Sequence, residues 1–262
     1  ENLVVGGDLV MRMAVEKQVP ILPIDSEHSA IFQCLAGEQS PIRRLIVTCS
    51  GGALRDVPME ELASVTPERA LKHPQWSMGA KITIDSSTLV NKGFEVIEAA
   101  WLFGLDADKI SVLIHPQSVI HSMVEYIDNT VIAQLGAPDM RSCIRYAASY
   151  PTRAWVEGKG LDFAALHSLT FDAPDTNTFP LLDAARDAIR RGGIAPTALV
   201  AADEEAVASF LRGEISLNTM AESVMEAMAM TADSTPSCVE DIYEAEQTAR
   251  KTTRLILQKY TR

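Results

Sequence analysis

The sequence lacks several features that would place it in common protein classes. Its four cysteines are scattered over 262 residues without a CxxC pair, which excludes zinc-finger and thioredoxin-like motifs and makes a disulfide framework unexpected. It has no run of about 18 apolar residues, so we expect no membrane span. Basic residues are few, with 23 Lys and Arg against 35 Asp and Glu and a net charge of −12. Nucleic acid and acidic membranes need a basic face, so we expect neither as a partner.

The composition is otherwise that of a globular protein, with 47% hydrophobic and 22% charged residues. Apolar and β-branched runs predict strands at 19–24, 44–48 and 81–85 and further strands within 112–134. A long helix is expected from Ser86 or Ser87 to residue 102. After residue 180, four alanine-rich segments with helical spacing predict a small bundle. We therefore expect an α/β (α+β) catalytic domain with a mixed sheet and flanking helices over residues 1–150, a linker over 151–180 and a four-helix bundle over 181–262.

Two carboxylates interrupt an apolar stretch at residues 21–32, ILPIDSEHSAIF. Asp25 and Glu27 are two residues apart at the end of a predicted strand, so their side chains point the same way and repel unless a cation or proton lies between them. Mg²⁺ or Mn²⁺ would relieve that repulsion, because both prefer oxygen ligands. The alternative is a loop whose charges face water.

A second group of polar residues lies at 85–95, DSSTLVNKGFE. The hydroxyls of Ser86 and its neighbours are expected to open a helix, where unpaired amides and the helix dipole attract anions. Asn91 and Lys92 follow, and Glu95 shares a helix face with Asn91. This pattern suits a phosphate and a metal ion together. An amphipathic helix with ordinary surface charges would have the same spacing.

Two further segments could contact the same ligand. Ser50 begins a Ser-Gly-Gly turn after a strand and could offer a hydroxyl and backbone amides to a phosphate, although a plain tight turn is the alternative. In the loop HPQWSM at 73–78, exposed Trp76 and Met78 suggest a lid with His73 as a cationic donor. The alternative is a loop inserted into the core. We interpret His115 and His121 as satisfied sheet or interface histidines rather than metal ligands.

Taken together, these segments resemble the 1-deoxy-D-xylulose 5-phosphate reductoisomerase family over nearly the whole chain. The resemblance lies in LPIDSEHSAIFQ (22–33), TCSGG (48–52), HPQWSMGAKITIDSSTLVNKGFEVIEA (73–99), LIHPQSVIHSMV (113–124) and AQLGAPDMR (133–141). It implies an NADPH- and Mg²⁺- or Mn²⁺-dependent oxidoreductase and isomerase of isoprenoid precursor synthesis. The implied reaction rearranges the carbon skeleton of 1-deoxy-D-xylulose 5-phosphate and then reduces the bound aldehyde to 2-C-methyl-D-erythritol 4-phosphate.

The resemblance also implies roles for individual residues. Asp25, Glu27 and Glu95 would bind the metal ion and, with His73, form the catalytic set. The substrate would be bound by Ser26, Ser50, His73, Trp76, Ser86, Asn91 and Lys92. Met78 and Gly79 would lie near the nicotinamide of NADPH. A homodimer is also implied.

The sequence departs from the family pattern in three places. The family begins with a glycine-rich nucleotide-binding domain, and no such GxGxxG-like run occurs here, so we expect the chain to be the catalytic part of a longer protein and inactive alone. Cys49 stands where glycine is usual. Val200 and Asp203 replace the first and fourth residues of the usual Asn-Ala-Ala-Asn-Glu.

Two other functions remain as alternatives. The same carboxylates would serve a metal-dependent phosphatase or lyase without a redox step, and NADPH dependence separates the two. The chain could also be a non-catalytic assembly fragment that pairs subunits through residues 112–134. For location, we expect a bacterial cytoplasm, with a plastid or other organelle as the alternative.

Overall fold

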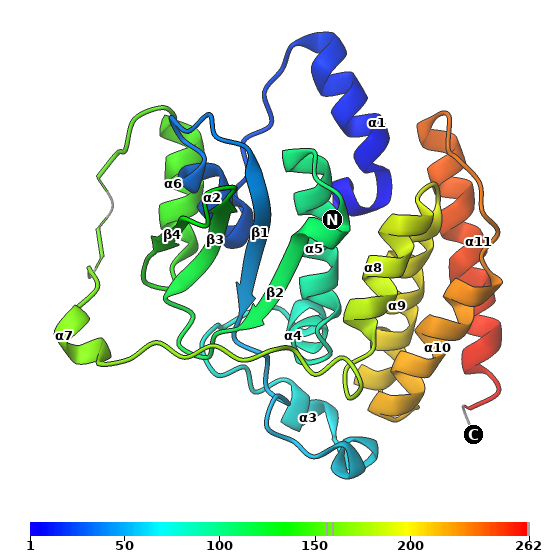
Figure 1. Ribbon diagram of the computed structural model, residues 1–262. Coiled ribbons are helices and arrows are strands. Elements are labelled where there is room, and N and C mark those ends of the chain that lie inside the picture. Colours follow the sequence, from blue (N-terminus) through cyan, green and yellow to red (C-terminus); the bar gives the residue numbers. More distant parts are fainter. Residues whose placement is uncertain (156, 159, 261–262) are drawn as a thin grey trace. The chain divides into compact units, whose positions relative to one another are not determined.

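The computed structural model describes residues 1–155, 157–158 and 160–260 (Figure 1). The chain forms two compact units, each discontinuous in sequence. The helical unit comprises Glu1–Gln18, Gly52–Ala107 and Asp175–Arg262, and the sheet unit comprises Val19–Gly51 and Asp108–Pro174. The predicted division at 1–150, 151–180 and 181–262 was continuous in sequence and stays a prediction. Residues 156 and 159 of the predicted linker, and 261–262 at the end of the predicted bundle, lie outside the described residues.

The sheet unit is built on a mixed four-stranded sheet with the order β2-β1-β3-β4. The strands are β1 (Ile42–Cys49), β2 (Ile110–Ile114), β3 (Ile120–Tyr126) and β4 (Val131–Leu135). β1 is central: it pairs in parallel with β2 and antiparallel with β3. Its residues Leu45, Ile46 and Val47 are all buried. This explains why β1 has a continuous apolar run rather than an alternating pattern.

Two helices of the same unit cover the sheet. α2 (Ser26–Cys34) packs on β3 and β4, and α6 (Met140–Ser149) packs on α2. The hydroxyl of Tyr126 in β3 donates a 3.0 Å hydrogen bond to the carbonyl of Cys34 at the end of α2. This packing fixes α2, and therefore its N-terminus, against the sheet.

The segment predicted as a linker is partly integrated into the sheet unit. It contains the short helix α7 (Phe163–Leu166), and Asp172 forms an antiparallel bridge with Ile114 at the end of β2. His115 is fully buried, and its ring stacks on Phe171 with 4.8 Å between centroids. Nδ1 of His115 lies 2.9 Å from the carbonyl of Thr170. The interpretation of His115 as a satisfied sheet histidine is thus confirmed.

The helical unit contains the remaining helices. These are α1 (Asn2–Lys17), η1 (Met59–Ser64), α3 (Pro67–Ala70), α4 (Ala80–Ser87), α5 (Val90–Phe103), α8 (Leu181–Arg191), α9 (Ala195–Leu211), α10 (Leu217–Met230) and α11 (Val239–Leu257). The short η2 (Ala107–Lys109) follows α5. α9 is buried along most of its length and contacts α1, α4, α8, α10 and α11. The four predicted C-terminal helices are therefore confirmed, and they share one core with α1, α4 and α5.

The close approach of α5 to α8 depends on a glycine. A Cβ atom on Gly93 would lie 2.4 Å from Cβ of Ala185, which is far inside van der Waals contact. Gly93 precedes Glu95 by two residues, so the packing that fixes α5 also fixes the polar residues at its beginning.

Two of the predicted strands are wrong. Residues 19–24 form no strand, and residues 81–85 lie within α4. A short alternating run fits one helical turn nearly as well as a strand, and the hydroxyls of Thr83 and Ser87 bond to carbonyls four residues earlier, Gly79 and Thr83. The strands at 44–48 and within 112–134 are confirmed. Among the described residues, no helix is both long enough and apolar enough to cross a membrane.

Candidate functional site

The first group of predicted site residues lies at the N-terminus of α2, in the sheet unit. Asp25 is the N-cap, and its Oδ1 accepts a 2.8 Å hydrogen bond from the amide of Ser26. The hydroxyl of Ser26 donates to Oε2 of Glu27 at 2.5 Å. Unpaired amides and the helix dipole favour negative charge here. The sequence therefore places two carboxylates at a helix end whose dipole favours negative charge.

The buried His28 of α2 has no role in the motif pattern of the sequence. Its Nδ1 lies 3.3 Å from Oδ2 of Asp25, one helical turn earlier, and its side chain is 2% exposed. A buried imidazole beside a half-exposed carboxylate orients that carboxylate, as groups around a metal ligand commonly do. The i,i+3 spacing of Asp25 and His28 across an N-cap was the available signal.

A buried thiol from α6 also lies near this carboxylate group. Burial raises the pKa of Cys143 to about 11; a hydrogen bond with Ser29 lowers it, and the charges of Glu27 and Asp25 raise it further. Cys143 is therefore a neutral thiol at physiological pH. It contributes packing to the sheet unit rather than nucleophilic chemistry.

Ser50 follows β1 directly and is buried. The two glycines after it have positive φ angles, 85° at Gly51 and 72° at Gly52. A Cβ on Gly52 would lie 2.5 Å from the carbonyl oxygen of Ser86. Only glycine fits both the backbone conformation and this close approach, so the backbone at Gly52 and the predicted phosphate residue Ser86 are in direct contact.

The predicted helix start at Ser86 or Ser87 is wrong. Ser86 lies in the last turn of α4, and a new helix, α5, begins at Val90. Leu89 separates the two helices with a left-handed φ of 62°, which interrupts the helical path after Ser87. The anion-attracting amides are therefore those of Val90, Asn91 and Lys92 in the first turn of α5.

The second group of predicted site residues lies on α5, in the helical unit. Nδ2 of Asn91 donates to Oε1 of Glu95 at 2.7 Å, and Nζ of Lys92 donates to Oε2 at 2.5 Å. Lys92 and Glu95 are both about 95% buried. Each oxygen of Glu95 thus accepts a strong hydrogen bond, one of them from a cation. An ionised carboxylate is held in place at the start of the helix.

The predicted lid residues lie in the loop between α3 and α4 and at the N-cap of α4, Gly79. Trp76 and Met78 are half-buried. Nδ1 of His73 accepts hydrogen bonds from the amides of Gln75, at 3.2 Å, and Trp76, at 2.9 Å. Burial lowers the pKa of His73. Burial thus favours the neutral ring, and because Nδ1 accepts from two amides, the proton of that neutral ring lies on Nε2; the cationic role of His73 stays a prediction.

The predicted site residues thus form local groups in each unit. Asp25, Ser26, Glu27 and Ser50 belong to the sheet unit, whereas His73, Trp76, Met78, Gly79, Ser86, Asn91, Lys92 and Glu95 belong to the helical unit. Carboxylate oxygens, present in both units, are the donors that a hard divalent ion such as Mg²⁺ or Mn²⁺ prefers. The amides, hydroxyls and ammonium group around the start of α5 suit a phosphate.

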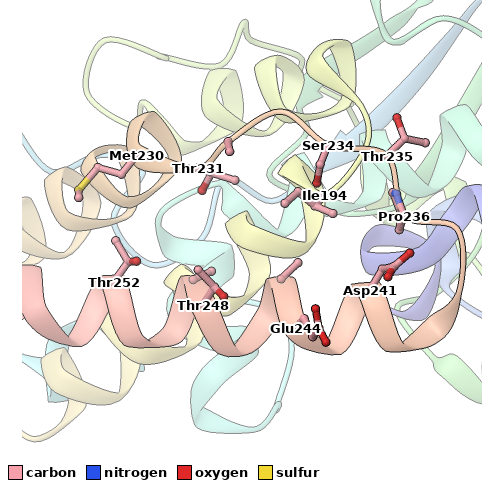
Figure 2. Close-up of a pocket in the computed structure, with 13 residues that line it drawn as sticks. Ile194, Met230, Thr231, Ser234, Thr235, Pro236, Asp241, Glu244, Thr248 and Thr252 are labelled. Atoms are coloured by element: carbon pink, nitrogen blue, oxygen red, sulfur yellow. The ribbon is translucent and has the colours of Figure 1, made fainter.

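A cavity of about 490 Å³ lies elsewhere in the helical unit, beside α11 (Figure 2). Figure 2 shows Asp241, Glu244, Thr248 and Thr252 along α11, facing the segment from Met230 to Pro236. No predicted site residue lines this cavity. The predicted site residues of the helical unit and this cavity are therefore separate features of that unit.

Comparisons with known proteins agree with the motifs. Residues 21–103 match a family model described as the 1-deoxy-D-xylulose 5-phosphate reductoisomerase C-terminal domain, and residues 135–252 match the DXP reductoisomerase C-terminal domain. The chain is 54% identical over 258 residues to the 1-deoxy-D-xylulose 5-phosphate reductoisomerase of Chlorobium chlorochromatii, covering 98% of the chain and 68% of the relative. It is 51% identical over 264 residues to that of Caldanaerobacter subterraneus subsp. tengcongensis, covering 100% and 68%.

Solved structures give the same result. The reductoisomerase from Zymomonas mobilis in complex with NADPH matches with a TM-score of 0.92 and 42% identity, covering 98% of this chain and 66% of that one. A DOX-P reductoisomerase in complex with NADPH, fosmidomycin and magnesium matches with a TM-score of 0.90 and 39% identity, covering 98% and 68%. The chain therefore spans about two thirds of the length of the proteins that it matches.

Proposed function

Because the chain belongs to the 1-deoxy-D-xylulose 5-phosphate reductoisomerase family, we propose that it carries the metal- and substrate-binding part of an enzyme that converts 1-deoxy-D-xylulose 5-phosphate to 2-C-methyl-D-erythritol 4-phosphate. The first stage rearranges the carbon skeleton to an aldehyde. In the second stage, hydride from NADPH and a proton reduce the aldehyde to an alcohol. The single observation that carries the proposal is Glu95, held ionised on α5 by Asn91 and Lys92.

The proposed metal ligands are Asp25, Glu27 and Glu95, and the ion is Mg²⁺ or Mn²⁺. A bound ion would supply Lewis acidity toward the ketone and the neighbouring hydroxyl of the substrate. Carboxylate chemistry and the α2 helix dipole support the assignment of Asp25 and Glu27. His28 orients Asp25, and Lys92 compensates the charge of Glu95 when no ion is bound.

The proposed phosphate site lies around the first turn of α5. Lys92 would contribute charge, Asn91 and the hydroxyls of Ser50 and Ser86 would donate hydrogen bonds, and His73 would donate through Nε2. Contacts at the phosphate, remote from the reacting carbons, orient the substrate without taking part in bond changes. Ser26 would contact the substrate backbone.

The loop before α4 is proposed to cover the bound substrate. Trp76 would close over the ligand and exclude water, which keeps the aldehyde in place until reduction. Met78 and Gly79 would contact the nicotinamide of NADPH. The half-buried state of Trp76 and Met78 is compatible with side chains that become covered when a ligand binds.

The experiment is an NADPH absorbance assay with 1-deoxy-D-xylulose 5-phosphate and Mn²⁺, on the protein at the full length of its relatives. We expect NADPH oxidation that needs both substrate and metal. Glu27→Gln and Glu95→Gln should each lower kcat/KM by on the order of 100-fold or more and weaken Mn²⁺ binding measured by calorimetry. The control Glu240→Gln changes an exposed side chain on α11 and should leave both unchanged. Release of phosphate without NADPH oxidation would overturn the proposal in favour of a phosphatase or lyase.

A homodimer is proposed on the free edge of the sheet. β4 lies at that edge (Figure 1), and no second strand among the described residues pairs with it. Val131 and Ile132 in β4 and the adjacent Ile127 are exposed. A second copy would cover an edge that otherwise favours aggregation. Light scattering should show a dimer that Ile132→Lys disrupts; a monomeric parent protein would contradict this proposal.

A further inference from the structure

Three charged residues form a buried cluster between α4 and α9, away from the proposed ligands. Nζ of Lys81 lies 2.7 Å from Oδ2 of Asp85, one turn further along α4, and 3.0 Å from Oδ2 of Asp203 on α9. Both carboxylates are completely buried, and Lys81 is 30% exposed. The ring of Phe94 on α5 lies 4.9 Å from the same nitrogen. One ammonium group is therefore shared by two carboxylates that water does not reach.

The cluster holds more negative than positive charge. Each aspartate side chain interacts with Lys81 and with the other aspartate, and among the described residues no further donor satisfies their four oxygens. Glu1, half-exposed, also approaches Lys81, at 3.3 Å. Two ionised, fully buried carboxylates at one partly exposed cation would leave an uncompensated negative charge, which is costly in a protein interior.

The neighbouring helices supply no second cation to this pair. On α5, Lys92 bonds Glu95. On α3, Arg69 approaches Glu61. The other acids of α9 face α11, where their partners are Arg250 and Arg254: Glu204 bonds Arg250, and Glu205 bonds both. Among the described residues, Lys81 is the one cation in contact with Asp85 or Asp203.

A proton resolves the imbalance. Burial raises the pKa of Asp85 well above its usual range, and the adjacent charge of Asp203 raises it further, against the effect of Lys81. Burial also raises the pKa of Asp203, although Lys81 opposes this. Two close carboxylates with one proton between them are a stable arrangement, because they cannot both ionise without repulsion.

We propose that Asp85 and Asp203 hold one proton between them under Lys81, and that this cluster positions Ser86 by fixing the last turn of α4 against α9. Asp85 directly precedes Ser86, and Ser86 in turn touches the backbone of Gly52. The part that concerns Ser86 as a phosphate-binding residue rests on the proposed function. The shared proton and the fixed end of α4 are independent of the proposed function.

The proposal has a definite pH dependence. In the folded state the pair keeps its proton to a higher pH than in the unfolded state. Its contribution to stability is therefore fully present at acidic pH and is lost as pH rises through the folded pKa of the pair. Above that pH the two carboxylates repel each other, and the last turn of α4 loosens.

The test replaces one carboxylate by its neutral isostere, Asp203→Asn, in this chain. In the parent chain, the ¹³Cγ resonances of Asp85 and Asp203 should titrate together well above the normal aspartate range, and the amide of Ser86 should shift with them. In the variant, Asp85 is left with Lys81 alone, so its ¹³Cγ resonance should no longer titrate above the normal aspartate range. Asp187→Asn, at an exposed position on α8, makes the same charge change and should keep both titrations. If Asp203→Asn does not fold, Asp85→Asn removes the same titration.

Stability gives an independent readout. The unfolding equilibrium constant of the parent chain, relative to Asp203→Asn, should rise by up to about tenfold per pH unit from the normal aspartate pKa of about 4 up to the pKa of the folded pair, and should level off above it, as expected for the loss of one proton. A ratio that is constant from pH 5 to pH 9, or ¹³Cγ resonances that titrate only in the normal range, would overturn the shared proton.

Ligand binding tests the consequence for Ser86. At full length with Mg²⁺, the parent protein should lose affinity for fosmidomycin relative to Asp203→Asn as pH rises; comparing the two at each pH cancels the titration of the phosphonate itself. If the fosmidomycin affinities of the two proteins change in parallel with pH and the amide resonance of Ser86 does not shift, the cluster does not position Ser86. Binding by neither protein, with the Ser86 amide still following the proton, would instead refute the proposed function and leave the cluster as described.

Discussion

Nζ of Lys92 lies 2.5 Å from Oε2 of Glu95, less than one helical turn further along α5, and both side chains are about 95% buried. The proposed function assigns Lys92 to the substrate phosphate and Glu95 to the metal ion. In the structure these two residues neutralise each other. A metal ion at Glu95 would therefore release part of the Lys92 charge toward an anion. Metal and phosphate binding are expected to favour each other through this pair.

Replacing one residue of this pair should destabilise the protein more than replacing both. Lys92→Met removes the cation that bonds Glu95, and Glu95→Gln removes the anion that bonds Lys92. Each change should lower the free energy of unfolding by about 3–5 kcal/mol. The double variant should lose less than either. Urea denaturation of the four proteins measures the coupling. The half-exposed pair Arg186 and Asp183 on α8, with the same spacing, should show a coupling below about 1 kcal/mol. Additive losses at Lys92 and Glu95 would contradict this picture.

The loop before α4 should loosen in acid because of His73. Its Nδ1 accepts two backbone hydrogen bonds, from Gln75 and Trp76, and burial lowers its pKa below the usual 6.5. The unfolded state then binds more protons than the folded state just below pH 6.5. The stabilisation is present above pH 6.5 and is lost as pH falls through the folded pKa.

The amide resonances of Gln75 and Trp76 report this change directly. Both should shift together between pH 7.5 and pH 5 as the ring is protonated. His73→Asn retains a side-chain acceptor that does not titrate, so these shifts should vanish in it. Amide shifts that persist in the variant would show that another group controls the loop.

The two buried cysteines of the sheet unit should resist alkylation. Burial raises the pKa of Cys34 and of Cys143 to about 11. At pH 8, each thiol is therefore ionised in about one molecule in a thousand. Alkylation of each should be at least about 100-fold slower than in the unfolded chain. Cys49 and Cys238 are partly exposed. Iodoacetamide labelling followed by mass spectrometry should modify Cys49 and Cys238 first, and all four in denaturant. Equal labelling of Cys143 and Cys238 in the native chain would count against the packing of α6 on α2.

Much of the site could be predicted from the sequence because its residues are adjacent in the chain. Asp25 and Glu27 flank Ser26 at one helix end, and Asn91, Lys92 and Glu95 lie within two turns of α5. Local spacing is enough to place such residues on one surface. The same argument explains the confirmed strands and C-terminal helices, whose periodicity is long and regular.

The rest depends on contacts between distant parts of the chain. The segment 81–85 alternates like a strand, but the ion pair of Lys81 with Asp85 requires helical spacing, and Asp203, 118 positions further on, completes it. The break at Leu89 has no strong sequence signal, since a leucine rarely adopts a left-handed φ. The role of His28 depends on its burial, which its neighbours in sequence do not reveal.

The stability of the contact between α5 and α8 should depend on having only one methyl group, at either residue 93 or residue 185. In Gly93→Ala the new Cβ would lie 2.4 Å from Cβ of Ala185, and forcing the helices apart should cost about 1–3 kcal/mol. The same change gains up to about 1 kcal/mol of helix propensity, which is smaller, so the variant should be destabilised. Adding Ala185→Gly moves the methyl group from α8 to α5 and restores the space. The double variant should therefore unfold at a higher urea concentration than Gly93→Ala, although Ala185→Gly alone is destabilising. Because Glu95 lies on the same helix, Mn²⁺ affinity at full length should follow the same order. A double variant that is less stable than both single variants would show that shape at this contact, rather than volume, controls the position of α5.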